Sequence, residues 1–293
     1  MTSKYDDMMK GKNYLPYNID YMPPKIRQKA KDELKETDEI VAPSLEKMRE
    51  LIRGEKRFKC PMNDEFLIQF LRARKFDVKK AFALLQSMFE VKKSYSDMYD
   101  QADMDALRKV VAAGPGYCFP YRDPDGCVVL VLQLNKWNPD ESSISIGLTA
   151  LTALLLSIVE NPVTQVCGVR VLVDVKGFTL RQMRSVTPRY IHLLSRALRN
   201  CFPIRFKGIH FFNESTIFQY VWSVLKIVLT EKIRKRVHFH GDNQKSLHKL
   251  IPKEILNAEY GGDNICYDGG EWSTEEINKY APTFQMLMTQ GYY

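Results

Sequence analysis

The sequence GVRVLVDV, residues 168–175, predicts a strand that is almost entirely apolar on both of its faces. Strands of this kind occur in parallel sheets that are covered on both sides. Similar runs predict further strands at 127–134 (CVVLVLQL), 204–212 (IRFKGIHFF) and, more briefly, 236–239. Helical segments are expected between them at 142–159, 180–200, with an interruption near Pro188, and 215–229. This alternation predicts an α/β domain with a largely parallel sheet.

The sequence before Gly114 has a different pattern and predicts helices alone. Asn63 or Asp64 can cap a helix and Asp77 can cap a longer one, and apolar residues then recur at helical spacing. We therefore expect four segments: a mobile N-terminal tail at 1–24, a helical bundle at 25–110, an α/β domain at 111–265 and a C-terminal extension at 266–293. The extension either covers the edge of the domain or stays mobile.

Composition excludes several classes of protein. The chain has 293 residues, of which 45% are hydrophobic and 27% charged, so it is neither disordered nor collagen-like. Its six cysteines form no C-x-x-C pair and are expected to be reduced thiols of a cytosolic protein. The first fourteen residues contain no apolar core of a secretory signal.

One uncharged run of 18 residues, 142–159, has the minimum length of a membrane span. It is flanked by Asp140, Glu141 and Glu160, whereas a span usually has basic residues on its cytoplasmic side. We therefore expect a helix buried within a soluble domain, with a transmembrane segment as the alternative.

Motifs for catalysis and metal binding are missing from the sequence. It contains no phosphate-binding loop, dinucleotide fingerprint, nucleophile elbow or H-E-x-x-H. His238, His240 and His248 resemble a metal cluster, but no cysteine or carboxylate lies at a suitable spacing. An enzyme would have to use Asp174 and His210, which are more typical of structural roles. We therefore expect that the protein is not an enzyme and that it binds no cofactor or metal.

The helix at 215–229 is apolar around most of its circumference. Its polar residues form one narrow stripe: Gln219, Ser223, Lys226 and Thr230. A helix of this kind is either a central core helix or a lid, with one face on an apolar cavity and the other facing a membrane.

Basic residues concentrate around that helix. Residues 201–240 contain seven basic and two acidic residues, a difference of five within a net charge of +8 for the chain. An apolar helix beside basic residues suits an anionic membrane. An ordinary solvated charge run is the alternative. Nucleic acid is not expected, because no nucleic-acid-binding module accompanies the charge.

Four segments in this order resemble the CRAL-TRIO family of lipid-binding proteins. They are FLIQFLRARKFD (66–77), FPIRFKGIHFFNE (202–214), LTEKIRKRVHFHG (229–241) and SLHKLIPKEILNAEYGGD (246–263). The resemblance covers roughly residues 25–265. It is strongest to the branch that contains alpha-tocopherol transfer protein, cellular retinaldehyde-binding protein and the clavesins.

The resemblance implies a helical bundle followed by a mixed α/β domain that encloses a hydrophobic pocket. The helix at 215–229 would be a mobile gate, which opens at a membrane to load or release one lipophilic molecule such as a tocopherol or retinoid. It also implies a patch that binds phosphatidylinositol bisphosphate headgroups, made of Arg74, Arg205, Lys207, Lys232 and Arg236.

The candidates for lining the pocket are apolar residues of the strands and of two helices, and each could equally be an ordinary core residue. They are Leu156, Val159, Val171, Val173, Ile209, Phe211, Ile217, Phe218, Val221, Trp222 and Leu225. The expected protein is a cytoplasmic monomer, associated peripherally with endosomal or other intracellular membranes. The alternative is a phosphoinositide-binding scaffold or lipid sensor that recruits a partner protein.

Overall fold

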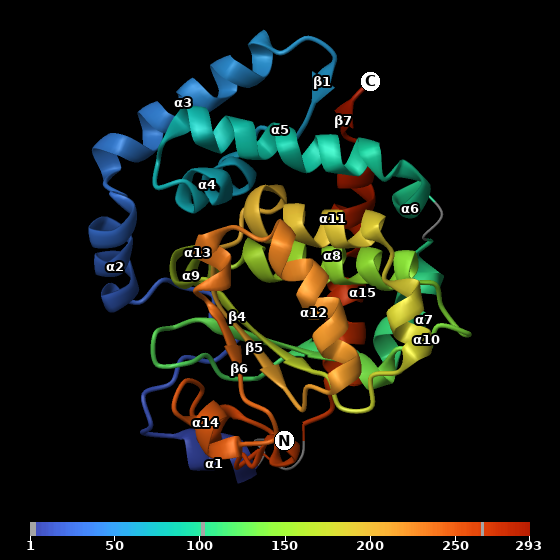
Figure 1. Cartoon of the computed structure of the whole chain (residues 1–293). Coiled ribbons are helices and arrows are strands. Elements are labelled where there is room, and N and C mark those ends of the chain that lie inside the picture. The colour runs from blue at the N-terminus through green and yellow to red at the C-terminus, as the bar shows by residue number, and fades with distance from the viewer. Residues whose placement is uncertain (1–3, 101–102, 265–266) are drawn as a thin grey trace.

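The computed structural model describes residues 4–100, 103–264 and 267–293, and it centres on one five-stranded sheet (Figure 1). The strand order is β2-β3-β4-β5-β6. Strand β2 is antiparallel to β3, and all other neighbours are parallel. The predicted α/β class with a largely parallel sheet is therefore confirmed. The strands span Gly116–Cys118, Val128–Gln133, Val169–Asp174, Phe206–Phe212 and Val237–Phe239.

Helices connect the parallel strands, as expected from the sequence. The interruption predicted near Pro188 is confirmed, since Pro188 is the first residue of a new helix. A five-residue π-helical turn follows that helix, at Ala197–Cys201. The connecting helices are α8 (Ile144–Glu160), α9 (Pro162–Cys167), α10 (Leu180–Ser185), α11 (Pro188–Arg196), α12 (Thr216–Val228) and α13 (Glu231–Arg234).

The two faces of the sheet contact different apolar clusters. On one face, Val171 and Phe211 belong to the large core that includes α8 and α12. On the other face, Leu172 and Phe212 pack with residues around α14 (Gln244–His248) and two short 3-10 turns, Lys253–Ile255 and Ala258–Tyr260. Figure 1 shows α8, α11 and α12 on the first side of the sheet and α14 on the second. The alternation of side chains along a strand produces this division.

The uncharged segment 142–159 forms α8, whose residues from Thr149 to Val159 are buried apart from Leu151. The Ser143 hydroxyl accepts a hydrogen bond from the amide of Ile146 and caps the helix. Within the part of the chain that the structure describes, no helix has the length and hydropathy needed to cross a membrane.

The N-terminal region is a helical bundle, with one addition. Its helices are α2 (Pro24–Leu34), α3 (Asp38–Gly54), α4 (Asp64–Ala73), α5 (Val78–Ser94), α6 (Ser96–Asp100) and α7 (Met104–Ala112). The predicted cap Asp77 accepts a hydrogen bond from the amide of Lys80, 3.1 Å away. The addition is a two-residue strand, β1 (Phe58–Lys59), which pairs with β7 (Gly291–Tyr292) at the C-terminus.

The N-terminal segment differs from the mobile tail that the sequence suggests. It contains a short helix, α1 (Lys4–Met9), and buries Tyr5, Met9 and Ile19. The amide of Tyr17 donates a hydrogen bond to the carbonyl of Pro120, 2.8 Å away. Aromatic and apolar side chains, spaced through a polar segment, bury against the domain and hold it in place.

The C-terminal extension is part of the core. Helix α15 (Gly269–Met288) packs against α7, α8 and β2, and it buries Ile277, Tyr280 and Phe284. A Cβ atom at Gly269 would lie 2.3 Å from the ring of Tyr117, so only glycine permits this close approach. Of the two alternatives for residues 266–293, the structure supports coverage of the domain edge.

Candidate functional site

Helix α12 lies at the surface with apolar side chains on both of its faces. Phe218 is its one fully buried residue among those described. Four further residues pack partly buried on the core: Ile217, Val221, Trp222 and Leu225. On the opposite face, Tyr220 is 68% exposed, Val224 47% and Ile227 75%. A central core helix would expose no such face, so α12 is a surface helix with apolar residues on its outer side.

Aromatic rings hold the inner face of α12 against the sheet. The ring of Phe218 lies 4.8 Å from that of Phe211 on β5 and 6.0 Å from that of Phe178, measured between centroids. Trp222 lies 5.8 Å from Phe211 and 5.2 Å from Phe239 on the edge strand β6. These contacts attach the helix to the strands.

A small part of the sheet surface beneath α12 remains accessible. Val171, Val173, Ile209 and Phe211 each keep 6–8% of their surface accessible, although they lie on the central strands β4 and β5. On the other face of the same strands, the accessible fraction of the buried residues ranges from 0% at Leu172 to 6% at Asp174. A water-sized sphere therefore reaches the face below α12. All eleven predicted lining residues belong to the apolar core on this side or pack against it.

A small cavity elsewhere in the core is a different feature. It measures about 20 Å³ and lies among α5, α8 and α15, and Leu156 is the one predicted lining residue that it touches. That volume holds about one water molecule and is far too small for a lipid. A larger and more open hollow of about 230 Å³ is lined by the N-terminal segment, Tyr121 and Trp272, with no residue of α12. The candidate ligand site below α12 thus rests on its apolar lining and not on a cavity volume.

Four cations surround Lys232 on α13. Burial lowers the pKa of Lys232, and the positive charges of its neighbours lower it further. Those neighbours come from three separate regions of the chain: Arg236, Arg74, Lys75 and Arg205. We call Lys232 and these four residues the basic cluster. Lys232 makes no ion pair within the described residues, so an anion placed there would relieve repulsion among like charges.

The arginines of the basic cluster are held by backbone carbonyls and side chains. Arg74 donates to the Asn200 side chain at 2.9 Å and to the Arg199 carbonyl at 3.3 Å. Arg236 donates to the carbonyl of Phe206. These two arginines are thus oriented before any ligand arrives.

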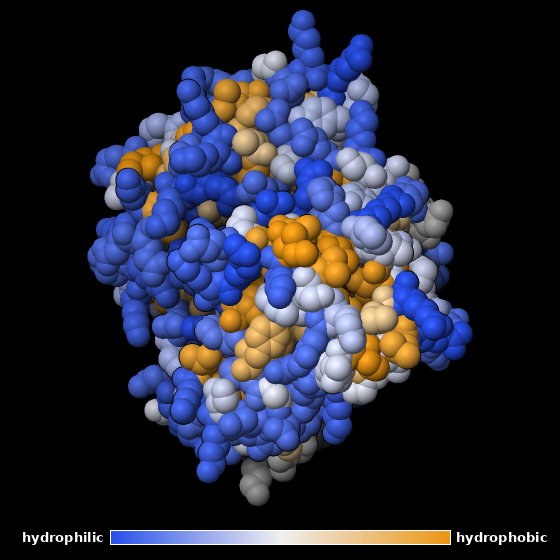
Figure 2. All heavy atoms as spheres, in the orientation of Figure 1, coloured by the Kyte–Doolittle hydropathy of each residue, from blue (hydrophilic) through white to orange (hydrophobic). Residues whose placement is uncertain are grey.

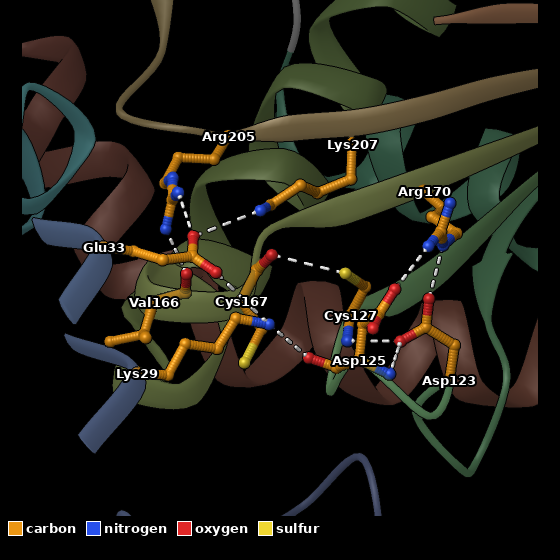
Figure 3. Close-up of polar contacts among 10 residues, drawn as sticks. All are labelled: Lys29, Glu33, Asp123, Asp125, Cys127, Val166, Cys167, Arg170, Arg205 and Lys207. Atoms are coloured by element: carbon orange, nitrogen blue, oxygen red, sulfur yellow. Dashed lines mark hydrogen bonds and ion pairs between the residues drawn. The ribbon is translucent and has the colours of Figure 1, made fainter. Parts of the chain in front are cut away.

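The basic cluster contains Lys75, which the sequence analysis did not name, and four of the five residues that it did name, all except Lys207. Lys75 and Phe76 adopt positive φ angles of 54° and 58°, an unusual backbone for residues other than glycine. This turn directly follows α4 and carries Arg74 and Lys75 together to the basic cluster. Lys207 joins at the margin, where its Nζ lies 3.4 Å from a carboxylate oxygen of Glu33 (Figure 3).

The residues considered for catalysis face away from α12. By strand alternation, Asp174 and His210 point to the same side as Leu172 and Phe212. The carboxylate of Asp174 accepts hydrogen bonds from Asn213 and from the Tyr260 hydroxyl, and the His210 ring stacks on the rings of His238 and His240. Among the residues that the structure describes, no three histidine, cysteine or acidic side chains are grouped to hold a metal.

An apolar patch and the basic cluster share one face of the molecule. Figure 2 shows apolar surface over α12, bordered by polar and charged residues. Its exposed members include Leu180 on α10, which contacts α12, and Phe239 on β6. Helix α13, which carries Lys232, follows α12 after a short turn, so the charge lies next to the patch.

Two family models match the sequence. The CRAL/TRIO domain matches residues 114–262, and the CRAL/TRIO N-terminal domain matches residues 25–87. An alpha-tocopherol transfer protein-like protein of Homo sapiens is 33% identical over 246 residues, which cover 84% of this chain and 72% of the relative. Clavesin-1 of Rattus norvegicus is 32% identical over 254 residues, with 85% and 72% covered. Clavesin-2 of Mus musculus is 33% identical over 262 residues, with 85% and 77% covered.

These matches extend from the helical bundle through the whole sheet and include α12 and the basic cluster. The domain model alone spans half of the sequence, and the relatives exceed 30% identity over most of it. The chain belongs to the CRAL/TRIO family.

Proposed function

We propose that this chain is a non-enzymatic lipid-transfer protein, which holds one lipophilic molecule below α12 and docks on phosphoinositide-containing membranes through its basic cluster. The family and its tocopherol-transfer and clavesin relatives support lipid binding and transfer. The observation that carries the finer proposal is α12 itself. It has an inner apolar face that packs on the central strands of the sheet and an outer apolar face beside five cations.

The physical mechanism requires only binding and a change of equilibrium. A small apolar molecule would lie against Val171, Val173, Ile209 and Phe211, with α12 as the cover. A membrane would accept the exposed side chains of α12, while the basic cluster binds phosphate groups of lipid headgroups. Docking drives exchange if the membrane binds the open position of α12 more tightly than the closed one.

The proposed setting is a monomer that associates peripherally with intracellular membranes such as endosomes. In the alternative, the same parts serve a lipid-sensing scaffold that recruits a partner protein. Movement of a ligand between vesicles distinguishes the two proposals, because a scaffold does not require it.

The test measures transfer of a fluorescent tocopherol and a fluorescent retinoid from donor to acceptor vesicles, with and without phosphatidylinositol bisphosphate. The Lys232→Ala variant should dock about fivefold more weakly on bisphosphate vesicles, since a basic residue near an anionic surface contributes about 1 kcal/mol. Lys235→Ala is the matched control, because Lys235 is exposed on the same segment and pairs with Glu231. Equal losses in both variants would contradict a role for the basic cluster.

The identity of the ligand can be approached with the purified protein. Native mass spectrometry, followed by organic extraction, would detect a molecule that co-purifies in stoichiometric amount. If neither probe moves between vesicles and no apolar molecule is bound or accepted, the transfer proposal is wrong and the scaffold is favoured.

A further inference from the structure

Helix α2 of the N-terminal bundle is fixed against the α/β domain. Its buried residues Ile26, Ala30 and Leu34 pack with Val163 and Val166 of α9, in a cluster that also contains Cys127 and Cys167. On its polar side, Lys29 Nζ donates to the carbonyl of Asp125 at 2.8 Å. The position of the next turn of α2, which carries Glu33, is therefore set by packing.

Glu33 forms ion pairs with two residues of the predicted phosphoinositide patch. Its Oε2 accepts from Arg205 Nη2 at 2.8 Å and from Lys207 Nζ at 3.4 Å, as Figure 3 shows. Lys29 lies 3.9 Å from the other carboxylate oxygen. Burial raises the pKa of Glu33, but the hydrogen bond from Arg205 and the surrounding positive charges outweigh it and lower the pKa. The carboxylate is thus ionised at neutral pH.

The same guanidinium belongs to the basic cluster. Arg205 acts electrostatically on Lys232, and it also donates to the carbonyl of Val166. One acidic side chain therefore neutralises part of the surface where an anionic headgroup would bind. The Glu33 side chain is 37% exposed, so it can turn toward water without leaving a charge buried and unpaired.

We propose that Glu33 determines the headgroup specificity of this surface, by occupying a phosphate position on Arg205 and Lys207 that only a multiply charged headgroup displaces. This inference rests on the proposed docking function and specifies its ligand class. When a lipid headgroup with one negative charge replaces the Glu33 carboxylate, the negative charge beside Arg205 and Lys207 stays the same, so the exchange brings no electrostatic gain. The tether of Glu33 to a fixed helix also gives the carboxylate a high effective concentration.

A phosphomonoester has two advantages over such a lipid. It carries a charge of about −1.5 to −2 and three strong acceptor oxygens. It can also bond both nitrogens of the arginine fork, as carboxylates do, while leaving an oxygen for the lysine. A bisphosphorylated inositol headgroup brings two such groups, one for Arg205 and Lys207 and one for the cations around Lys232.

The experiment compares two vesicle types that are matched for total surface charge. Both contain phosphatidylcholine, with either phosphatidylserine or phosphatidylinositol bisphosphate as the anionic lipid. The variants are Glu33→Gln and the control Asp32→Asn. Asp32 lies one residue earlier on α2, is exposed and bonds to Gln28, so both variants change the net charge equally.

Glu33→Gln should bind phosphatidylserine vesicles about fivefold more tightly than the natural chain, and bisphosphate vesicles with a smaller gain. The preference for bisphosphate therefore falls. Asp32→Asn should leave that preference unchanged. The readout is the ratio of the affinities of one protein for the two vesicle types. A variant with damaged folding would bind both vesicle types more weakly, so it would not produce the expected fall in preference.

Two outcomes would overturn the inference about Glu33. Only the second would also overturn the docking proposal. If the natural chain prefers bisphosphate vesicles and Glu33→Gln retains the full preference, Glu33 has no role in specificity and the docking proposal stands. If the natural chain has no preference between charge-matched vesicles, headgroup docking itself is wrong and the inference falls with it. Competition by soluble inositol trisphosphate, measured in parallel, identifies the second case.

Discussion

The ring of Phe218 on α12 packs against the ring of Phe211 on the sheet, with centroids 4.8 Å apart and planes inclined by 44°. Phe211 lies on β5, between two parallel neighbours, and Phe218 is the α12 residue that is fully buried. A pair of this kind adds about 0.5–1.5 kcal/mol to the stabilisation from burial. The contact joins a central strand of the sheet to the helix that we propose to move.

The first prediction concerns Phe218→Ala, which removes this contact. Truncation of a buried phenylalanine costs about 3–5 kcal/mol in a well-packed core, and here much of the loss falls on the attachment of α12. Amide hydrogens of residues 216–228 should exchange at least about tenfold faster, which corresponds to about 1.4 kcal/mol. Hydrogen exchange measured by mass spectrometry resolves this segment from β5. Equal acceleration in α12 and β5 would mean global destabilisation rather than release of the helix.

The second prediction concerns the outer face of α12 and uses Tyr220→Asp. Tyr220 is 68% exposed, so the substitution leaves the core intact, but it places a negative charge where the proposed surface enters the membrane. Binding to bisphosphate vesicles should fall roughly tenfold or more, since an apolar contact is lost and an anionic surface repels the new charge. Flotation or sedimentation with vesicles measures the loss.

Tyr21→Asp is the matched control for that variant. Tyr21 is 62% exposed and lies in the N-terminal segment rather than on α12, and the chemical change is the same. An equal loss of vesicle binding in both variants would show that net charge, and not the face of α12, governs docking.

The sheet could be predicted from the sequence because its strands are apolar on both faces. The runs at 127–134, 168–175 and 204–212 permit few other structures, and each contains an observed strand. The surface position of α12 was harder to predict. Its outer residues Tyr220 and Ile227 are as apolar as its inner ones, so periodicity alone left a core helix and a lid as alternatives.

Contacts between distant residues could not be predicted from local patterns. Glu33 and Arg205 are 172 positions apart, and no signal within α2 indicates that its carboxylate meets a basic cluster. Lys75 could have been proposed from its position after Arg74, but its place depends on a backbone turn with positive φ. The sequence also underestimates how far the two terminal segments pack on the domain. Their apolar residues are sparse, and the residues that they contact lie far away in the sequence.

The third prediction follows from α15 and uses Phe284→Ala. Phe284 keeps 2% of its surface accessible and belongs to the main core, which also includes α8. The free energy of unfolding should fall by about 3–5 kcal/mol. Met286→Ala, two positions away on the same helix and 39% exposed, should change it by less than about 1 kcal/mol. Urea unfolding followed by circular dichroism measures both. A small effect of Phe284→Ala would mean that the extension is dispensable for the fold.

The last prediction concerns three stacked histidines on the sheet face opposite α12. The Nδ1 atom of His210 lies 3.1 Å from Nε2 of His240, and its ring stacks 4.9 Å from that of His238. Burial, which is the largest cause, and the charges of His238, His240 and Arg170 together lower the pKa of His210 to about 3. Burial also lowers the pKa of His238 and His240.

The sign of the pH effect follows from these directions. An unfolded chain protonates a histidine near its ordinary pKa of about 6.5, whereas folded His210 stays neutral. Below that pH the unfolded state binds more protons than the folded state. The free energy of unfolding therefore decreases as the pH is lowered, by roughly 1.4 kcal/mol per pH unit for one such group. His210→Phe keeps an aromatic ring but cannot be protonated, and it should reduce the slope of stability against pH between about pH 6 and about pH 4.

The test compares slopes of the free energy of unfolding against pH, so a change in the absolute stability of the variant does not affect it. The Nε2 atom of His210 is buried without a hydrogen-bond partner among the described residues, so a carbon there loses no hydrogen bond, whereas the contact of Nδ1 with His240 is lost. His192→Gln is the control, because His192 is exposed on α11 and its loss removes a histidine without disturbing the stack. Urea unfolding at several pH values gives the three slopes. If His210→Phe retains the natural slope, another group is responsible for the acid sensitivity of the fold.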